Sequence, residues 1–123
     1  MLYSHSCFKQ TTTEGEPVLV FLHGLLGSGE DWQSSIEQLP NSNWITIDLP
    51  GHGQSQEYAC ADFFQCCQQI SHTILSQLEP NTPIILIGYS LGGRIAYLIR
   101  SQIMEQVTHI IDLHTGAIHR FNL

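Results

Sequence analysis

The stretch GYSLG, residues 88–92, has the residue types and spacing of a serine nucleophile held in a sharp turn. An apolar run precedes it and a helix-like run follows, so Ser90 stands where a strand passes into a helix. Glycines on both sides of the serine let the strand and the helix approach closely. Such a turn projects the hydroxyl into a cleft, near the positive end of the helix. The pattern predicts nucleophilic or proton-transfer chemistry at Ser90.

Two backbone N–H groups are candidates for stabilising negative charge beside that serine. One belongs to Leu91, directly after the serine, and the other to Leu25, in a glycine-rich loop after an earlier apolar run. Two N–H groups aimed at an oxyanion contribute about 3 kcal/mol each to transition-state stabilisation. The alternative is that these glycines only pack a helix closely on a strand and carry no chemistry.

Apolar runs define the elements that must position these groups. Buried strands are predicted at 17–24, 44–49, 82–90 and 107–113, and helices within 30–39 and at 61–80 and 91–103. Because strands and helices alternate, we predict an α/β fold of three layers, α/β/α, around a mostly parallel sheet. Residues 114–123 show no clear pattern. No linker or repeat interrupts the chain, so we expect one domain over residues 1–123.

Glycine-containing loops follow three of the predicted strands, at residues 23–29, 50–53 and 88–92. In a parallel sheet, ligands bind beyond the carboxyl ends of the strands, so we expect these loops to meet at one edge. His23 and His52 lie in two of them. Each histidine either contacts a ligand or is a structural residue whose ring is hydrogen-bonded within the loops.

Composition disfavours several classes of partner. The net charge is −7 with only four basic residues, which disfavours nucleic acid and anionic membrane surfaces. No apolar run approaches the ~20 residues of a membrane span, and residues 1–17 lack a signal-peptide pattern. The cysteines have no zinc-site spacing, so we expect no metal. We predict reduced, partly buried thiols in a cytoplasmic protein; the four cysteines are Cys7, Cys60, Cys66 and Cys67.

Three stretches carry a resemblance to a known family: FLHGLLGSGEDW (21–32), DLPGHGQS (48–55) and GYSLGGR (88–94). In this order and spacing they resemble the α/β-hydrolase superfamily, over residues 17–100. More narrowly, they look like the 2-succinyl-6-hydroxy-2,4-cyclohexadiene-1-carboxylate synthases (SHCHC synthases) of menaquinone biosynthesis. The resemblance implies a lyase that eliminates pyruvate from 2-succinyl-5-enolpyruvyl-6-hydroxy-3-cyclohexene-1-carboxylate, a small carboxylated substrate. It also implies a Ser-His-Asp triad and no cofactor.

The resemblance assigns roles to individual residues of this chain. Ser90 is the expected catalytic serine, acting in proton abstraction. Leu25 and Leu91 are the expected oxyanion-hole residues, and Tyr89 and Arg94 are the expected substrate-binding residues. His23 is a further candidate for substrate binding, because its loop lies at the same edge.

Arg94 also has support from its spacing. It follows Ser90 by four residues, so both lie on one helix face, and helical side chains lean back toward the N-terminus. A planar guanidinium near the serine suits a carboxylate of the substrate. The alternative for Arg94 is a structural ion pair with Asp48 or with another carboxylate.

The acid and the histidine of the triad have no evident counterparts. After Ser90 the sequence offers two acids and three histidines: Glu105, Asp112, His109, His114 and His119. Asp112 ends a predicted strand, where some hydrolases place an acid, and His119 is the alternative base. The expectation is a truncated domain that lacks the family's cap, its C-terminal strands, the triad acid and the triad histidine.

Truncation has a physical consequence for the sheet. The strand at 107–113 would carry an unpaired edge, and apolar surface would be uncovered. We therefore expect marginal stability or self-association through that edge. Two alternative functions are a serine esterase or thioesterase of the same fold and a catalytically inactive remnant.

Overall fold

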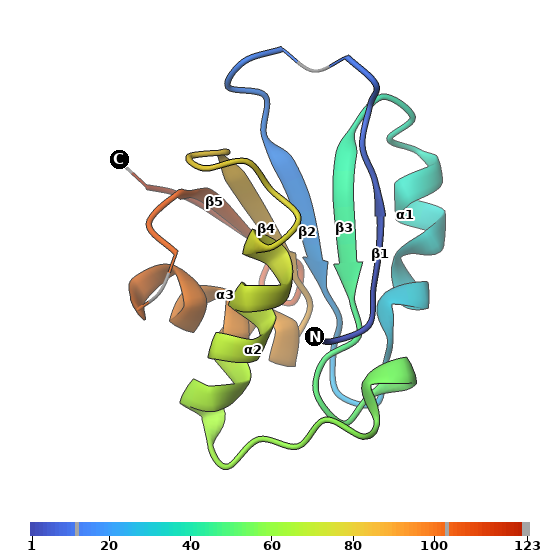
Figure 1. The fold of residues 1–123 in the computed structure, drawn as a ribbon, viewed down its shortest axis with the longest axis vertical. Helices are drawn as coiled ribbons and strands as arrows, with labels where there is room; N and C mark the ends of the chain where they lie inside the picture. Colours follow the sequence, from blue (N-terminus) through green and yellow to red (C-terminus); the bar gives the residue numbers. More distant parts are fainter. Residues whose placement is uncertain (12, 103, 122–123) are drawn as a thin grey trace.

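The computed structural model describes residues 1–11, 13–102 and 104–121 (Figure 1). These residues form six strands: β1 (Ser4–Cys7), β2 (Val18–Leu22), β3 (Asn43–Ile47), β4 (Ile84–Gly88), β5 (Val107–Asp112) and β6 (Ala117–Arg120). The helices are α1 (Gln33–Glu37), α2 (Phe63–Leu75) and α3 (Leu91–Gln102), and two 3-10 turns are η1 (Gly29–Trp32) and η2 (Gly53–Ser55). None of the described helices is long and apolar enough to cross a bilayer.

The strands make one sheet in the order β1-β3-β2-β4-β5-β6. Its four central strands are parallel, as predicted, while β1 and β6 add antiparallel edges. The α/β fold is therefore confirmed, with a mixed sheet of more strands than the apolar runs indicate. Because β2, β3 and β4 are neighbours, the loops that follow them emerge at the same edge of the sheet.

The expectation of an unpaired edge at 107–113 is wrong. β6 pairs with β5 along four residue pairs, from His109–Arg120 to Asp112–Ala117. The chain reverses at residues 113–116, where Gly116 has φ +78°, a left-handed conformation that glycine adopts without steric cost. The free edges of the sheet are therefore β6 on one side and β1 on the other.

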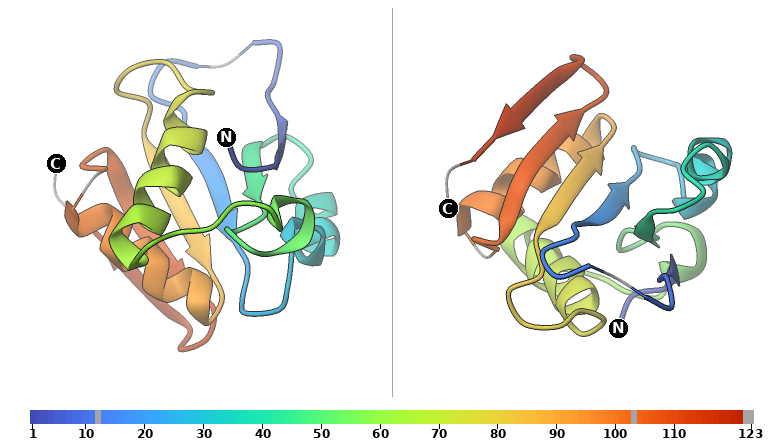
Figure 2. Two further views of the ribbon diagram at one scale, coloured as in Figure 1. Left: turned by 60° about the horizontal axis from the view of Figure 1, so that its bottom comes forward. Right: turned by 90° about the horizontal axis from the view of Figure 1, so that it is seen from above.

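Helices cover the two faces of the sheet unequally (Figure 2). α2 and α3 pack together on one face, over side chains such as Val20, Ile45 and Leu86. On the other face, Trp32 and Ile36 from η1 and α1 pack against a smaller cluster. Strand residues alternate between the two clusters, because successive side chains of a strand point to opposite faces.

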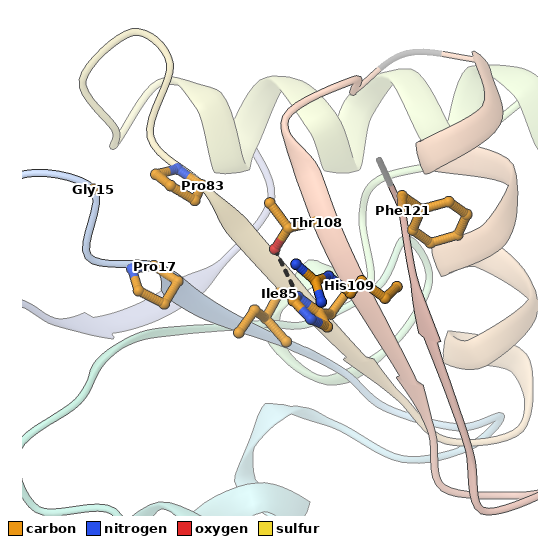
Figure 3. Close-up of a pocket in the computed structure, with 8 residues that line it drawn as sticks. Gly15, Pro17, Pro83, Ile85, Thr108, His109 and Phe121 are labelled. Atoms are coloured by element: carbon orange, nitrogen blue, oxygen red, sulfur yellow. Dashed lines mark hydrogen bonds between the residues drawn. The ribbon is translucent and has the colours of Figure 1, made fainter. Parts of the chain in front are cut away.

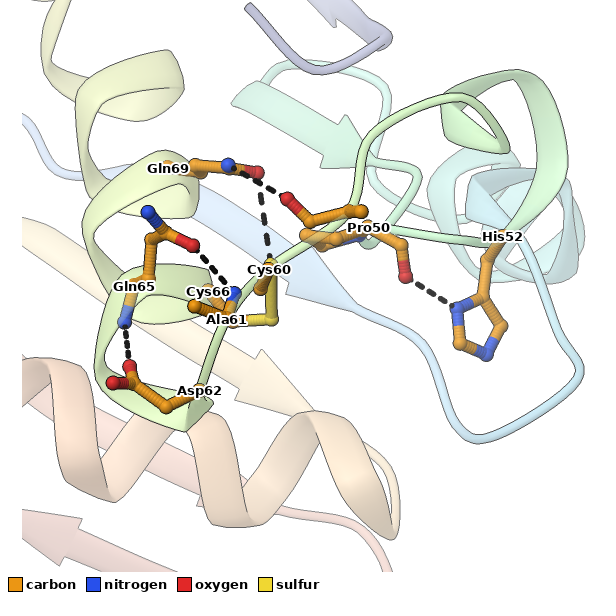
Figure 4. The surroundings of a disulfide bond; sticks show 9 residues. Pro50, His52, Cys60, Ala61, Asp62, Gln65, Cys66 and Gln69 are labelled. Carbon is orange, nitrogen blue, oxygen red and sulfur yellow. Dashed lines mark hydrogen bonds between the residues drawn. A yellow bond between two sulfur atoms is a disulfide. The ribbon is translucent and has the colours of Figure 1, made fainter.

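Two of the four cysteines are paired, so the expectation of reduced thiols is wrong for them. Cys60, in the loop before α2, forms a disulfide with Cys66 in the first turns of that helix, with Cα atoms 5.4 Å apart (Figure 4). Between them, Asp62 caps the helix by accepting a hydrogen bond from the Gln65 N–H at 2.8 Å. The cap begins the helix there and brings the two cysteines together. Burial raises the pKa of the remaining buried thiol, Cys67.

Candidate active site

Ser90 occupies a strained position between β4 and α3. Its backbone φ is +55°, in the left-handed region where a residue with a side chain costs about 1–2 kcal/mol. The residue is exposed, at the carboxyl edge of the sheet, and α3 begins at the next residue. The geometry is that of a sharp strand-to-helix turn that presents a serine to solvent.

The two glycines that flank the serine are sterically required. A Cβ atom added at Gly88 would lie 2.5 Å from the Gly93 nitrogen, and one added at Gly92 would lie 2.0 Å from the Leu22 oxygen. Both contacts are with backbone atoms, which cannot move aside without shifting the sheet or the helix. The spacing of glycines around Ser90 therefore reflects close contact of α3 with β4 and β2.

The loop after β2 lies directly against this turn. A Cβ added at Gly24 would come within 2.9 Å of the Tyr89 ring and 3.3 Å of the Tyr89 carbonyl oxygen. From Gly24 the chain makes a tight turn, closed by a hydrogen bond from the Gly27 N–H to the Gly24 oxygen at 3.1 Å. Leu25 and Leu26 form the tip and are largely exposed, and Leu26 has φ +66°. Leu25 and Ser90 thus lie on neighbouring loops, as the sequence predicts.

Leu91 takes the first position of α3. The first N–H groups of a helix have no partner within the helix, so the Leu91 N–H is available to a ligand beside Ser90. The two candidate oxyanion amides therefore come from the loop after β2 and from the start of α3.

His23 is a buried structural residue in this structure. It is 1% exposed, and both of its ring nitrogens are engaged. Nδ1 lies 2.7 Å from the Gly24 oxygen, and Nε2 lies 3.0 Å from the Leu49 nitrogen, which donates. Desolvation by burial lowers the pKa of His23. Neither ring nitrogen of His23 is therefore free to bind substrate. The geometry fits the alternative, in which His23 is a structural residue hydrogen-bonded within the loops.

Asp48, which ends a predicted strand and is placed by the sequence to orient the loop around Gly51, is a further site residue. Its carboxylate is 4% exposed and accepts hydrogen bonds from the Gly29 N–H at 2.7 Å and the Gln54 N–H at 2.9 Å. It thereby ties the loop after β2 to the loop after β3. The signal in the sequence is an acid at a strand end between two glycine-rich loops.

His52 lies in the loop that Asp48 holds. Its Nδ1 is 3.0 Å from the Pro50 oxygen, and its ring centroid is 5.1 Å from that of His23 (Figure 4 shows the His52–Pro50 contact). A hydrogen bond within its own loop matches the structural alternative for this histidine.

A small pocket of about 220 Å³ opens beside the turn. Tyr89, which is half exposed, forms part of its wall. The lining residues are His23, Gly24, Asp31, Trp32, Tyr89 and Leu113. Of the predicted substrate-binding residues, Tyr89 and His23 border this pocket and Arg94 does not.

Arg94 is exposed on α3 and its N–H donates to the Ser90 carbonyl oxygen at 3.2 Å. Within the described residues, no carboxylate lies in ion-pair distance of its guanidinium. The oxygens of Asp48 already accept two backbone N–H groups. The structural ion pair between Arg94 and Asp48 is thus not formed, and the guanidinium is available to solvent or to a ligand.

No triad is assembled around Ser90 in residues 1–11, 13–102 and 104–121, where the serine hydroxyl has no hydrogen-bond partner. The Asp112 carboxylate accepts the His114 N–H at 3.0 Å. The His119 ring packs on Tyr97 at 5.2 Å, and His109 contacts the Thr108 hydroxyl at 2.9 Å. The alternative that His119 serves as the base is therefore not realised.

A larger pocket of about 470 Å³ lies at the other ends of the parallel strands (Figure 3). Pro17, Pro83 and Thr108 on its wall stand before or at the start of β2, β4 and β5. This pocket lies at the opposite ends of the strands from Ser90. The candidate active site is therefore not identified by pocket volume alone.

Comparison with known proteins agrees with this geometry. A family model described as the alpha/beta hydrolase fold matches residues 17–111. The chain is 46% identical over 82 residues to the 2-succinyl-6-hydroxy-2,4-cyclohexadiene-1-carboxylate synthase of Pectobacterium atrosepticum, and the match covers 66% of this chain and 31% of that protein. The chain spans about a third of the length of the curated relatives it matches.

Two solved structures show the same arrangement. The chain superposes on MenH from S. aureus with a TM-score of 0.75 and 30% identity, covering 91% of this chain and 42% of that one. It superposes on a marine microorganism esterase with a TM-score of 0.72 and 29% identity, covering 90% and 40% of the two chains.

Proposed function

Because the chain belongs to the alpha/beta hydrolase fold family, we propose that it carries the serine side of an SHCHC-synthase active site. One observation carries the proposal: a left-handed Ser90 between two sterically required glycines, next to the Gly24–Leu25 loop. The 46% identity over 82 residues to the SHCHC synthase of Pectobacterium atrosepticum supports the choice of reaction. The proposed substrate is 2-succinyl-5-enolpyruvyl-6-hydroxy-3-cyclohexene-1-carboxylate.

The proposed reaction is an elimination. Ser90, deprotonated by a histidine, takes the proton from the ring carbon next to the succinyl carbonyl. Negative charge then develops on that carbonyl oxygen, where the Leu25 and Leu91 N–H groups stabilise it. The charge returns through the ring as the C–O bond to the enolpyruvyl group breaks, and the group leaves as the enolate of pyruvate. The proton that the histidine took from Ser90 converts this enolate to pyruvate, while Ser90 keeps the proton from the ring carbon. No cofactor enters these steps.

The histidine is the missing part of this site. Since no described histidine contacts Ser90, we propose that the triad histidine and acid belong to the part of the fold that corresponds to the remaining two thirds of the relatives. We expect residues 1–123 alone to bind the substrate but to convert it only slowly. A serine without its base loses most of the rate enhancement of a triad, about 10⁴-fold or more.

Arg94 and Tyr89 are the proposed substrate contacts. The Arg94 guanidinium is exposed, unpaired in the described structure and one helical turn from Ser90. Its planar donors match a carboxylate bidentately, and the proposed substrate carries several carboxylates. Tyr89 supplies an aromatic wall to the pocket beside the turn.

Substrate binding to the chain tests this proposal. Isothermal titration with the enolpyruvyl substrate should show binding that Arg94→Ala weakens about tenfold or more and that Arg94→Lys weakens less, because lysine keeps the charge without the planar fork. Thermal melting of each variant controls for folding. Equal affinity of all three proteins would count against Arg94 and against a carboxylated substrate.

Serine ester hydrolysis is the second candidate function, supported by the superposition on a marine microorganism esterase. A side-by-side assay of pyruvate release and p-nitrophenyl ester hydrolysis separates the two reactions, when it is made on this chain joined to the region of a relative that supplies the triad histidine. Lyase function predicts pyruvate release that Ser90→Ala abolishes, with little ester hydrolysis. The opposite ratio would favour the esterase, and loss of both activities in every context would indicate an inactive remnant.

We also propose self-association, now through the free β6 edge rather than β5. Ile118 in β6 is 68% exposed, and an exposed apolar edge strand favours pairing with another chain. A cytoplasmic location stays a prediction from the cysteine usage and the pattern of residues 1–17, and the Cys60–Cys66 disulfide does not favour it, since disulfides are rare in that compartment.

A further inference from the structure

We propose that His23 is a positioning residue that sets the direction of the Leu25 N–H, one of the two candidate oxyanion donors. The role of that N–H as an oxyanion donor rests on the proposed function. The orientation of the peptide that contains it is argued from the hydrogen bonds of His23, independently of that function. It assigns the ring a role inside the protein in place of the substrate contact that the sequence predicts.

The key contact joins His23 to the peptide unit that contains the Leu25 N–H. The Gly24 carbonyl and the Leu25 N–H belong to one peptide, and all described peptides are trans. In a trans peptide the C=O and N–H point in opposite directions. The Gly24 oxygen is held by the His23 ring at 2.7 Å and by the Gly27 N–H at 3.1 Å. Fixing that oxygen therefore fixes the Leu25 N–H on the other side.

The tautomer of His23 is set by a second contact. The Leu49 N–H can only donate, so Nε2, 3.0 Å away, must accept. The proton of the neutral ring then resides on Nδ1, which donates to the Gly24 oxygen. Burial lowers the pKa of His23 and keeps the ring neutral near pH 7. The Leu49 N–H, at the start of the loop after β3, thus places the ring proton on Nδ1. That N–H then orients the Gly24–Leu25 peptide in the loop after β2.

An anchor is needed at this peptide because glycine precedes it. Gly24 has no side chain to restrict its ψ angle, and the turn tip that follows is exposed. Rotation of the Gly24–Leu25 peptide would point a carbonyl oxygen, rather than an N–H, toward a developing oxyanion. The Gly27 N–H alone supplies one bond from within the same exposed turn, whereas His23 links the peptide to the buried sheet edge.

Two amide substitutions separate positioning from mere packing. In His23→Asn the side-chain NH₂ stands as many bonds from Cα as Nδ1, so the donor to the Gly24 oxygen is kept. In His23→Gln the amide reaches the place of Nε2, so the contact to Leu49 is kept and the donor to Gly24 is lost. Both remove the buried ring and should lower the melting temperature similarly. His52→Gln, at the neighbouring loop histidine, is the matched control.

The measurement is the residual dipolar coupling of the Leu25 N–H in ¹⁵N-leucine-labelled protein, which reports the direction of that bond. We expect the wild-type coupling in His23→Asn and His52→Gln, and its loss by averaging in His23→Gln, with the Leu22 coupling unchanged in all. An unchanged Leu25 coupling in His23→Gln would overturn the proposal, whatever the melting temperatures show.

A variant-free measurement covers the case in which His23→Gln does not fold. The ¹⁵N spectrum of histidine-labelled wild-type protein should show His23 with its proton on Nδ1. A proton on Nε2 would overturn the proposal. Neither readout depends on turnover, so failure of the pyruvate assay would remove the proposed function without touching this inference.

Discussion

At the scale of single residues, Ser90 has a backbone conformation that residues with a side chain rarely adopt, and His23 has a titratable ring removed from water. Ser90 has φ +55°, and His23 is a buried neutral ring with a lowered pKa. Each state is held by neighbouring backbone: α3 and the sheet around Ser90, and the Gly24 and Leu49 peptide groups around His23. Strain and burial at two residues of one edge are typical of functional sites.

The strain at Ser90 predicts a gain in stability when the side chain is removed. Ser90→Gly should raise the free energy of unfolding by about 1 kcal/mol relative to Ser90→Ala, because only glycine adopts the left-handed conformation without cost. Both variants lack the hydroxyl, so the comparison isolates the backbone. Urea denaturation measures the difference, and equal stabilities would argue against strain at residue 90.

Burial of His23 predicts a pH dependence of stability. Its pKa in the folded protein lies below the ordinary value of 6.5, so below about pH 6.5 the unfolded chain binds the proton more readily. The free energy of unfolding should therefore fall as pH drops below 6.5, by at most about 1.4 kcal/mol per pH unit from this residue. In His23→Asn this part of the slope should vanish. Identical slopes between pH 6.5 and 5 in the two proteins would contradict the burial of a neutral His23.

At the scale of elements, the start of α3 packs on β2 through backbone contact. A Cβ added at Gly92 would meet the Leu22 oxygen at 2.0 Å, whereas one added at Gly93 would meet only the Asp112 side chain, at 3.2 Å. The same helix turn thus contains one glycine that the fold requires and one that it tolerates.

This difference predicts opposite outcomes for two adjacent alanine substitutions. Gly92→Ala should cost about 3 kcal/mol or more, because a methyl group cannot occupy the place of a backbone oxygen. Gly93→Ala should change stability by less than about 1 kcal/mol, since improved helix propensity offsets a contact with a movable side chain. Chemical denaturation of both variants decides this, and comparable losses in the two would contradict the packing described.

The elements differ in how far the sequence predicts them. The central parallel strands are visible because their apolar residues are buried on both faces. β6, with the sequence AIHR, and β1, with SHSC, are short and partly exposed edge strands, so they lack such a run. Their existence depends on pairing with β5 and β3, which local patterns do not encode.

The site shows the same limit. Ser90 and the Gly24–Leu25 loop were predicted to be neighbours because loops after parallel strands share an edge. The engagement of both His23 nitrogens and the Asp48 bridge between loops depend on backbone N–H groups whose directions no side-chain pattern reveals. The Cys60–Cys66 pairing likewise follows from the bend at the Asp62 cap.

At the scale of the whole molecule, the sheet is covered more fully on one face than on the other. α2 and α3 cover one face, while the described helix on the opposite face, α1, packs near β2 and β3. Toward β6 that second face presents Ile111, partly buried, and its partner Ile118, 68% exposed. Most parallel sheets are covered on both faces, so this surface favours association.

Association through this surface predicts a charge-sensitive oligomer. Sedimentation velocity should show concentration-dependent association of the wild-type chain, and Ile118→Lys should reduce it. Gln68→Lys, at an exposed position of α2 on the opposite face of the sheet, makes the same charge change and should leave association unchanged. A strictly monomeric wild-type chain, or equal effects of the two lysines, would contradict a role of β6.

The central claim concerns the serine turn: that residues of this chain form the serine side of an SHCHC-synthase site. The most direct measurement is pyruvate release by a chimera in which the matched residues of this chain replace the corresponding 82-residue segment of the Pectobacterium atrosepticum synthase. The rest of that protein then supplies what this chain lacks. A folded chimera should release pyruvate from the enolpyruvyl substrate, with loss of about 10⁴-fold or more in Ser90→Ala. A folded chimera that releases none, or whose rate does not depend on Ser90, would contradict the claim.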